Sequence, residues 1–346
     1  MEQDNNNLTE RELKILESVV RNYIVSAEPT GSRFLSKSSD LDVSAATIRN
    51  IMGDLEEKGY ITQPHSSAGR VPTDKGYRYY VDKIMQFTEL ADSTKTAIKS
   101  FIVASEPSDM NLVLAAATRA LSQATHQLGV VLAPKICSGV FKHVHVFEMN
   151  PRTILMHLTI DAGFVRTMAV ELETTIDPNR LERACELLNQ RFFGLTLQEL
   201  CDNGEKLFGD LESIDMGIIR LFIPSIKKMM TQPAEETTIY TQGETNVILQ
   251  PEFSGQEHLG AVIELLGEKR LLMHLLAPQS EGGGVSVSIG GENTDGQLRS
   301  FSAVKAPYKI GHMEGRLGIV GPTRMPYPFL ISAVDYTAKL LGEIYT

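Results

Sequence analysis

The stretch Val43–Tyr80 constrains the fold of this chain more than any other segment. Ser44 precedes a run with helical periodicity, and a serine there can accept a hydrogen bond from the free amides of a first helical turn. Gly59 suits the left-handed residue that follows the end of a helix. We therefore predict an amphipathic helix between these two residues. Its buried face is an apolar stripe at helical spacing: Ile48, Ile51, Met52 and Leu55.

The opposite face of this helix is small and polar near its N-terminus, and an Arg and an Asn follow. Small residues permit close approach to a DNA major groove, where Arg and Asn can pair with guanine and adenine edges. The face therefore suits DNA recognition. The residues that we predict to contact DNA from it are Ser44, Ala45, Thr47, Arg49 and Asn50.

The second half of the stretch predicts a β-hairpin, with strands at Tyr60–Gln63 and Arg70–Pro72. The loop between them contains no acidic residue, which suits contact with a phosphate backbone or a minor groove. A helix followed by a hairpin is typical of a winged helix-turn-helix, although it is also common in α+β proteins that do not bind DNA. The residues predicted to contact DNA from this hairpin are His65, Ser66, Ser67 and Arg70.

Charge and composition bound the possible functions. The chain has 346 residues and a net charge of −10, so it has room for two or three domains. Most of the acidity lies beyond the first 83 residues, and the predicted hairpin region is locally basic. We expect only modest non-specific affinity for DNA, because the basic footprint is small.

The chain shows no targeting or redox signature. No apolar run approaches the ~18 residues of a membrane span, and the polar start Met1–Asn7 argues against a signal peptide. Three cysteines stand far apart with no C-x-x-C spacing, which favours free thiols in a reducing cytoplasm over disulfides or zinc. We therefore expect a cytoplasmic protein with no membrane partner.

Periodicity assigns the flanking elements of the N-terminal region. Thr9 and Glu12 have the spacing of a capping box at the start of a helix that ends near Ser26. A short helix over Ser32–Ser38 follows, and Thr73 or Asp74 caps another helix after the hairpin. The polar segment Ala91–Lys99 is predicted to be a linker that ends the first domain.

The rest of the chain predicts one α+β domain in two halves that are separated by a helical insertion. Strands are expected at Val130–Ala133, Val140–Glu148, Thr153–Ile160 and Phe164–Leu172, and again at Val285–Ile289, Phe301–Tyr308 and Arg316–Val320. Helices are expected at Asp109–Gln127, Pro178–Phe193, Leu197–Phe208, Met216–Met230, Gln256–Leu266, Glu268–Leu276 and Tyr327–Ile344. A hairpin is expected at Thr237–Gln250, turning at Gln242-Gly243.

Other candidate sites are weaker. His143, His145 and His157 could hold a metal ion, but no acidic or cysteine partner stands at ligand spacing, which favours packed or surface histidines. The glycine-rich segment Ser280–Gly291 lacks a phosphate-binding pattern and is interpreted as a flexible connection. Arg324 could bind an anion near a helix N-terminus or hold two domains together, and we favour the second role.

Over essentially its whole length, the chain resembles the HrcA family of bacterial heat-inducible transcription repressors. The segments that carry this resemblance are Leu13–Ile24, Pro29-Thr30-Gly31-Ser32, Ser44–Tyr60 with Ala46-Thr47-Ile48-Arg49-Asn50, His65-Ser66-Ser67-Ala68-Gly69-Arg70-Val71-Pro72-Thr73, Ile289-Gly290-Gly291-Glu292-Asn293 and Gly321-Pro322-Thr323-Arg324-Met325-Pro326-Tyr327. Together these motifs are highly specific.

The resemblance implies an architecture and a set of partners. It implies a winged helix-turn-helix domain over residues 1–90, a GAF-like α+β domain in two halves, 105–194 and 281–346, and a mainly helical inserted dimerisation domain over 195–280. It further implies a homodimer that binds the CIRCE inverted-repeat operator upstream of chaperone operons, is kept active by a GroEL-type chaperonin, and is inactivated by heat. No catalytic role, metal or cofactor is expected.

Two rival functions remain open from the residues alone. The first is a ligand-gated winged-helix regulator, in which the second domain binds a small molecule. The second is a metal- or thiol-dependent enzyme that uses His143, His145 or Cys137. A thermal shift with one metabolite would indicate the regulator, and a metal retained through purification would indicate the enzyme.

Overall fold

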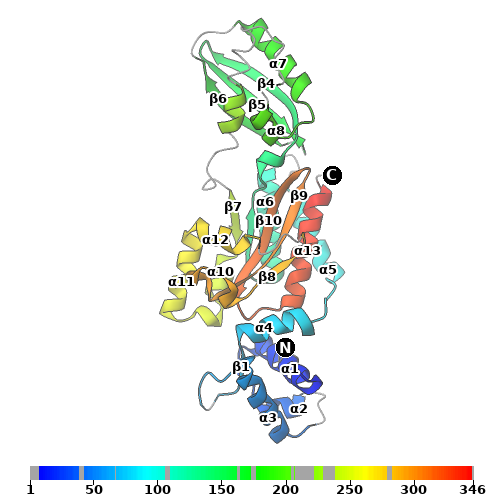
Figure 1. Ribbon diagram of the computed structural model, residues 1–346, viewed down its shortest axis with the longest axis vertical. Helices are drawn as coiled ribbons and strands as arrows, with labels where there is room; N and C mark the ends of the chain where they lie inside the picture. Colours follow the sequence, from blue (N-terminus) through cyan, green and yellow to red (C-terminus); the bar gives the residue numbers. More distant parts are fainter. Residues whose placement is uncertain are drawn as a thin grey trace, which may run out of the picture.

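The computed structural model describes residues 8–38, 43–66, 68–105, 110–161, 164–172, 177–203, 206, 222–228, 238–278 and 283–344. The molecule is elongated, with three parts stacked along its longest axis (Figure 1). A helical N-terminal part lies at one end, a five-stranded sheet with helices on both faces lies in the middle, and a smaller three-stranded sheet lies at the other end. The predicted mixture of helix and sheet is confirmed.

The N-terminal part follows the sequence prediction closely. Thr9 and Glu12 form the predicted capping box, and the Ser44 side chain accepts a hydrogen bond from the Thr47 amide. In the predicted helix, which packs against the first helix, Ile48, Met52 and Leu55 are buried and Ile51 is half-buried. The elements of this part are α1 (Glu10–Ser26), α2 (Ser32–Ser38), α3 (Ala45–Glu57), β1 (Ile61–Thr62) and β2 (Val71–Pro72).

A helical connection leads into the middle of the molecule. Thr73 caps α4, and the chain then continues through a π-helical turn, η1. The prediction of a polar linker at Ala91–Lys99 is wrong, because most of this segment belongs to α5, which buries Ile98 and Ile102 beside α6. The elements of the connection are α4 (Asp74–Tyr79), η1 (Tyr80–Ile84), α5 (Asp92–Val103) and α6 (Met110–Thr125).

The central sheet is entirely antiparallel and has the strand order β7-β3-β10-β9-β8. Its side chains alternate between two cores: Val131 points into the core that contains α6 and α13, and Val130 points into the core that contains α11 and α12. The strands are β3 (Leu128–Leu132), β7 (Ile239–Gln242), β8 (Ser286–Ser288), β9 (Phe301–Ile310) and β10 (Met313–Pro322). The helices are α10 (Glu244–Ile248), α11 (Gln256–Gly267), α12 (Lys269–Leu276) and α13 (Tyr327–Ile344).

The second sheet is also antiparallel, with the order β4-β5-β6, and only one of its faces packs against α7. The Asn189 side chain accepts a hydrogen bond from the Val144 amide at 2.7 Å and donates to the Val144 carbonyl at 3.1 Å, which satisfies the backbone at one edge of the sheet. The elements are β4 (Phe141–Asn150), β5 (Thr153–Ile160), β6 (Val165–Glu171), α7 (Pro178–Phe192) and α8 (Leu197–Asn203). Short 3₁₀ turns elsewhere are η2 (Ile136–Ser138), η6 (Pro251–Phe253), η7 (Gly290–Glu292) and η8 (Gly296–Leu298).

Strand pairing corrects the predicted division of the chain at 194 and 281. Strands β4 to β6 do not join the central sheet, whereas β7, placed by prediction in the insertion 195–280, pairs with β3. The expected hairpin at Thr237–Gln250 is also wrong, because Gly243 precedes helix α10 instead of turning into a second strand. In the structure, the segment inserted into the central domain therefore lies between β3 and β7. Most of the predicted helix Met216–Met230 lies outside the described residues.

Candidate nucleic-acid interface

Helix α3 turns the predicted polar face to solvent. Ile48, Met52 and Leu55 are 0–2% exposed, whereas Arg49 and Asn50 are exposed on the other side of the helix. Gly53 lies one turn further along that side, and a Cβ added there would meet nothing within 4 Å. The exposed side is therefore unobstructed, and it presents the two side chains best suited to base edges.

The N-terminus of α3 is held by hydroxyl groups that we predicted to contact DNA. The Thr47 amide donates to Ser44 Oγ at 3.2 Å, and the two hydroxyl oxygens lie 2.9 Å apart. Ser44 is exposed, while Ala45 and Thr47 are half-buried. Since each hydroxyl oxygen has two lone pairs, the cap leaves these groups able to form a further hydrogen bond.

The hairpin pairs Ile61 with Pro72 and Thr62 with Val71. Its loop is preorganised by Gln63, whose side-chain amide donates to the carbonyls of Ser66 and Ala68 at 3.0 and 2.9 Å. His65 and Ser66 are exposed at the tip, and Ser67 lies outside the described residues. The loop thus projects a polar surface beside α3.

Arg70 does not project from the hairpin as predicted. Its guanidinium binds the Glu56 carboxylate, with Nη2 to Oε2 at 2.8 Å and Nε to the same oxygen at 3.2 Å. Its backbone exchanges two hydrogen bonds of 2.9 Å with Thr30. Arg70 therefore joins the hairpin to the end of α3 and to the turn before α2, and its charge is largely neutralised by its own partner.

A second ion pair joins α1 to the end of α3. Lys58 Nζ lies 2.6 Å from Oε1 of Glu12, whose residue is only 4% exposed. Burial alone would raise the pKa of Glu12, but hydrogen bonds from Lys58 and Thr9 outweigh it and hold the pKa below its usual value. The same pairing raises the pKa of Lys58. The carboxylate thus remains charged and fixes the angle between the two helices.

Three further contacts fasten the N-terminal part to the central domain. Arg78 binds both carboxylate oxygens of Glu292, at 2.7 and 2.5 Å, and the Val287 carbonyl at 2.7 Å. The Gly291 amide donates to Asp74 Oδ2 at 2.8 Å. The glycine-rich segment predicted to be only a connection therefore forms a contact surface at its Gly291 end, a role that composition alone did not reveal.

Arg324 supplies the third contact. Its Nη1 donates to the carbonyl of Ile24, at the end of α1, at 2.8 Å, and Nη2 donates to the Gln250 side chain at 3.1 Å. It also forms an ion pair with Glu252. The prediction that Arg324 holds two domains together is confirmed.

Comparison with known proteins places these features in one family. The family model of the HrcA protein C-terminal domain matches residues 111–331. The chain belongs to the HrcA family. A relative from Chlorobium phaeobacteroides, named heat-inducible transcription repressor HrcA, is 34% identical over 345 residues, which cover 97% of this chain and 98% of the relative. A relative of the same name from Pelotomaculum thermopropionicum is 36% identical over 339 residues and 97% of both chains.

One solved structure shares the fold of this HrcA family member. It is described only as that of a hypothetical protein, and it matches 98% of this chain and 99% of its own length with a TM-score of 0.62 at 22% identity. This likeness concerns the fold alone. In the described part of the chain, no helix is both long enough and apolar enough to cross a membrane.

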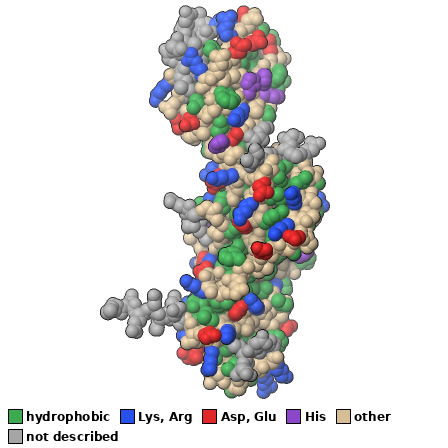
Figure 2. Space-filling view, turned by 90° about the vertical axis from the view of Figure 1, so that its right-hand side faces the viewer, with side chains coloured by type: hydrophobic (Ala, Val, Ile, Leu, Met, Phe, Trp, Pro, Cys, Tyr) green, Lys and Arg blue, Asp and Glu red, His purple; other side chains and the backbone are tan. Residues whose placement is uncertain are grey.

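The histidines singled out in the sequence lie on the second sheet of the HrcA family member. The rings of His143 and His145 have centroids 4.1 Å apart, and His157 is the strand partner of His145. Figure 2 shows histidine side chains gathered on the surface of this part. Within the described ranges, no group of three or more His, Cys, Asp or Glu side chains is arranged to hold a metal ion.

The cysteines of the HrcA family member are all free thiols and only partly exposed. Burial, with the nearby Glu182 charge, raises the pKa of Cys185 to about 11. Burial also raises the pKa of Cys201. Thiols of this kind stay protonated at neutral pH and are poor nucleophiles.

Proposed function

We propose that this chain represses chaperone operons by binding an inverted-repeat operator of the CIRCE type as a homodimer in the cytoplasm. In this proposal, α2, α3 and the β1–β2 hairpin act as a winged helix-turn-helix. The observation that carries it is the solvent face of α3, where Arg49 and Asn50 are exposed on a helix that packs against α1. Contacts of α1 and α4 with the central domain orient this helix together with the rest of the N-terminal part. The names of the relatives support the same function.

The chemistry of this face favours direct reading of bases. A major groove admits an α-helix, in which Arg pairs bidentately with guanine and Asn with adenine. Arg33 and Lys37, on the neighbouring helix α2, are exposed and suited to phosphates. Figure 2 shows Lys and Arg side chains at the N-terminal end of the molecule, away from the second sheet. The overall acidity of the chain therefore does not oppose DNA contact at this end.

An inverted repeat requires a protein with two-fold symmetry, and we propose that the open face of the second sheet forms the dimer contact. This face has no Lys, Arg, Asp or Glu among its central positions, and Phe147 and Val165 are 52% and 50% exposed on it. Large uncovered apolar side chains on a sheet indicate an interaction surface. The central positions of this face are His143, His145, Phe147, Leu155, His157, Thr159, Val165, Thr167 and Ala169.

Topology supports dependence on a GroEL-type chaperonin. Strand β3 pairs with β10, with Val130 opposite Gly318. The central domain, which we propose to be GAF-like, can therefore complete its sheet only after the chain between these strands has been synthesised. Contacts between residues so distant in sequence form slowly and leave apolar strands exposed meanwhile. We propose that the chaperonin captures this intermediate and that heating returns the repressor to it.

A footprint on DNA upstream of chaperone operons tests the function directly. The expected result is protection of two half-sites separated by a whole number of helical turns, with and without refolding by chaperonin. Chaperonin is expected to raise the number of active molecules and to leave the dissociation constant of the active fraction unchanged. Protection of a single half-site, or equal affinity for scrambled DNA, would contradict the proposal.

A further inference from the structure

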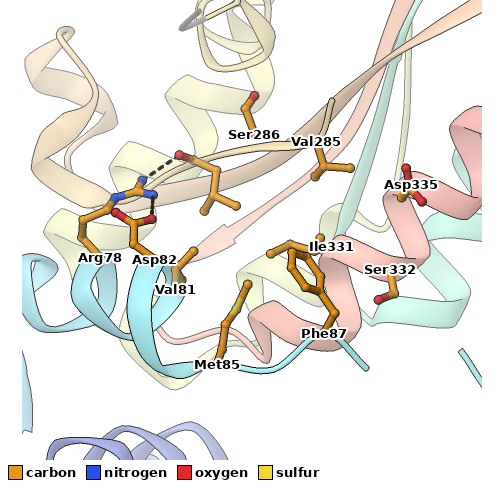
Figure 3. A pocket seen from close by; sticks show the side chains of 11 residues that line it. Arg78, Val81, Asp82, Met85, Phe87, Val285, Ser286, Ile331, Ser332 and Asp335 are labelled. Atoms are coloured by element: carbon orange, nitrogen blue, oxygen red, sulfur yellow. Dashed lines mark hydrogen bonds and ion pairs between the residues drawn. The ribbon is translucent and has the colours of Figure 1, made fainter. Parts of the chain in front are cut away.

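A cavity of about 540 Å³ lies where the N-terminal part meets the central domain (Figure 3). Its walls come from three segments far apart in the sequence: the end of α4 with η1 and the loop that follows, strand β8 with Val285, and helix α13. This volume falls within the range of small-molecule sites, which occur preferentially between domains. The proposed DNA contacts do not use it.

Apolar side chains project into this cavity from every wall. Met85 and Phe87 come from the loop after η1, Val285 lies beside β8, and Ile331 belongs to α13. Phe87 is 80% exposed although its ring points toward Ile331. An aromatic side chain can bury about 150–250 Å², so a ligand that covers Phe87 gains a large apolar contact.

The charges around the cavity select the sign of a ligand. Arg78 cannot receive an anion, because its guanidinium is occupied by Glu292, by the Val287 carbonyl and by Asp82. Asp82 is held by Arg78, so the carboxylate that remains for a ligand is Asp335, whose side chain is 42% exposed. Its partner Lys339 lies on the same helix and is itself 70% exposed, and an exposed pair of this kind is weak. Asp335 therefore keeps acceptor positions for a cation.

We propose that this cavity binds a small amphipathic cation, with an apolar body against Phe87 and Ile331 and an ammonium group beside Asp335. Because one wall is the connection that joins the N-terminal part to the central domain, occupancy changes how the N-terminal part is held. A ligand that distinguishes two arrangements shifts their populations and is coupled reciprocally to DNA binding. The coupling rests on the proposed function, whereas the binding does not.

The chain contains no tryptophan, so one introduced indole reports on the cavity alone. In Phe87→Trp, we expect phenethylammonium to produce a saturable change in emission, with a dissociation constant on the order of 1 mM for a fragment of about nine non-hydrogen atoms. Phenylacetate, a matched anion, should produce none. The control is Phe193→Trp, at a side chain 63% exposed on the part that carries the second sheet, which should respond to neither probe.

Two further measurements keep the test decisive. Asp335→Asn should weaken phenethylammonium binding about threefold, the range of one exposed ion pair. Magnetisation transfer to phenethylammonium from the unmodified chain should be saturable and displaced by no anion. The site is disproved if neither the F87W indole nor the unmodified chain binds the cation saturably, or if the anion binds as well.

The DNA arm separates this inference from the proposed function. Saturating phenethylammonium should change operator affinity at least about threefold, and operator should change the affinity of the cation by the same factor. If the chain binds the cation but binds no operator DNA, the repressor function is refuted and the cation site is retained. Operator binding that ignores a bound cation would refute the coupling.

Discussion

The two sheets of this molecule differ in how many of their faces the described residues cover. In the central sheet, strands β9 and β10 are buried along nearly their whole length, because α6 and α13 pack on one face and α11 and α12 on the other. In the second sheet, β6 is largely exposed, and β5 alternates between buried and half-buried positions. A sheet covered on both faces serves as a framework, whereas a sheet covered on one face retains a surface for a partner.

The same contrast appears within the N-terminal part. Arg70 is held by Glu56 and by the backbone of Thr30, whereas Arg49 is exposed and forms no ion pair with any described residue. A side chain that has a partner within the protein, as Arg70 has, holds helices and strands in position. Side chains that the protein leaves open are available to DNA or to a second copy, and substitutions at Phe147, Arg49 and Arg70 test this distinction.

The largest expected effect is on assembly. Phe147→Asp places a charge on the open sheet face, and burying two such charges in a dimer contact is strongly unfavourable. We expect the dimer dissociation constant to rise by about 100-fold or more, with a similar loss of operator affinity, because the two half-sites are no longer bound together. Sedimentation velocity and operator titration measure both quantities.

A matched control separates the open face from general surface effects. Phe193 is 63% exposed but is not among the central positions of this face, so Phe193→Asp should sediment as the unmodified chain does. Both variants should remain folded, since neither side chain is buried within its own chain. If the F147D chain remains a dimer, the contact lies elsewhere. The helix predicted at Met216–Met230 is then the next candidate.

The next effect concerns specificity. Arg49→Ala should cost about 1–3 kcal/mol of binding free energy on the operator and much less on random DNA, as expected for a contact with a base edge. Lys37→Ala is the control, because an exposed lysine on α2 suits a phosphate and should weaken both DNAs alike. Equal losses on operator and random DNA for R49A would indicate that Arg49, like Lys37, contacts the DNA phosphates and not a base edge.

Local patterns in the sequence predicted the N-terminal part well. The capping box of Thr9 and Glu12, the Ser44 cap and the Ile48–Met52–Leu55 stripe depend on neighbours within one or two helical turns, so they are visible without the fold. Arg324 was also assigned correctly, since a charged residue at a strand-to-helix turn has few roles. What could not be predicted is pairing between distant residues, such as that of Arg70 with Glu56 or Arg78 with Glu292.

The prediction of which strands form one sheet was wrong for the same reason. Strands β4 to β6 follow β3 directly in the chain, and nothing local says which strands are neighbours. The segment Ala91–Lys99 was assigned as a linker because its polar residues dominate, although Ile98 and Ile102 continue into a buried helical face. Strand partners and helix packing are long-range properties, which one sequence does not display.

The third effect concerns the framework. Lys305, on β9, is only 2% exposed, and its Nζ donates to the Leu275 carbonyl at 2.6 Å. Burial, reinforced by the nearby Arg316 charge, lowers the pKa of Lys305 from 10.5 to about 8. Below that pH the folded chain holds a disfavoured charge, so Lys305→Met should stabilise it by about 1–2 kcal/mol at pH 7, net of the lost hydrogen bond.

The pH dependence of this effect has a definite sign. Between about pH 8 and pH 10.5 the folded state loses the Lys305 proton while the unfolded state keeps it, so the free energy of unfolding should rise with pH. Urea unfolding at pH 7 and pH 9.5 measures this rise, which K305M should lack. If heating inactivates the chain as proposed, this destabilisation lowers the temperature at which that happens, and K305M should release its operator only at a higher temperature. An unchanged melting temperature in K305M would show that the Lys305 charge does not destabilise the folded chain.

The smallest effect concerns Arg70. Since Glu56 neutralises it, Arg70→Ala should lower the stability of the N-terminal part by about 0.5–1 kcal/mol and leave the salt dependence of DNA binding unchanged. Glu56→Gln removes the partner and frees the guanidinium, so the slope of log affinity against log salt should steepen by about 0.9, the value for one added phosphate contact. The double variant should return to the original slope. If R70A alone flattens the slope by that amount, Arg70 leaves Glu56 when DNA is bound and contacts phosphate, and the division between paired and open side chains does not hold in the hairpin.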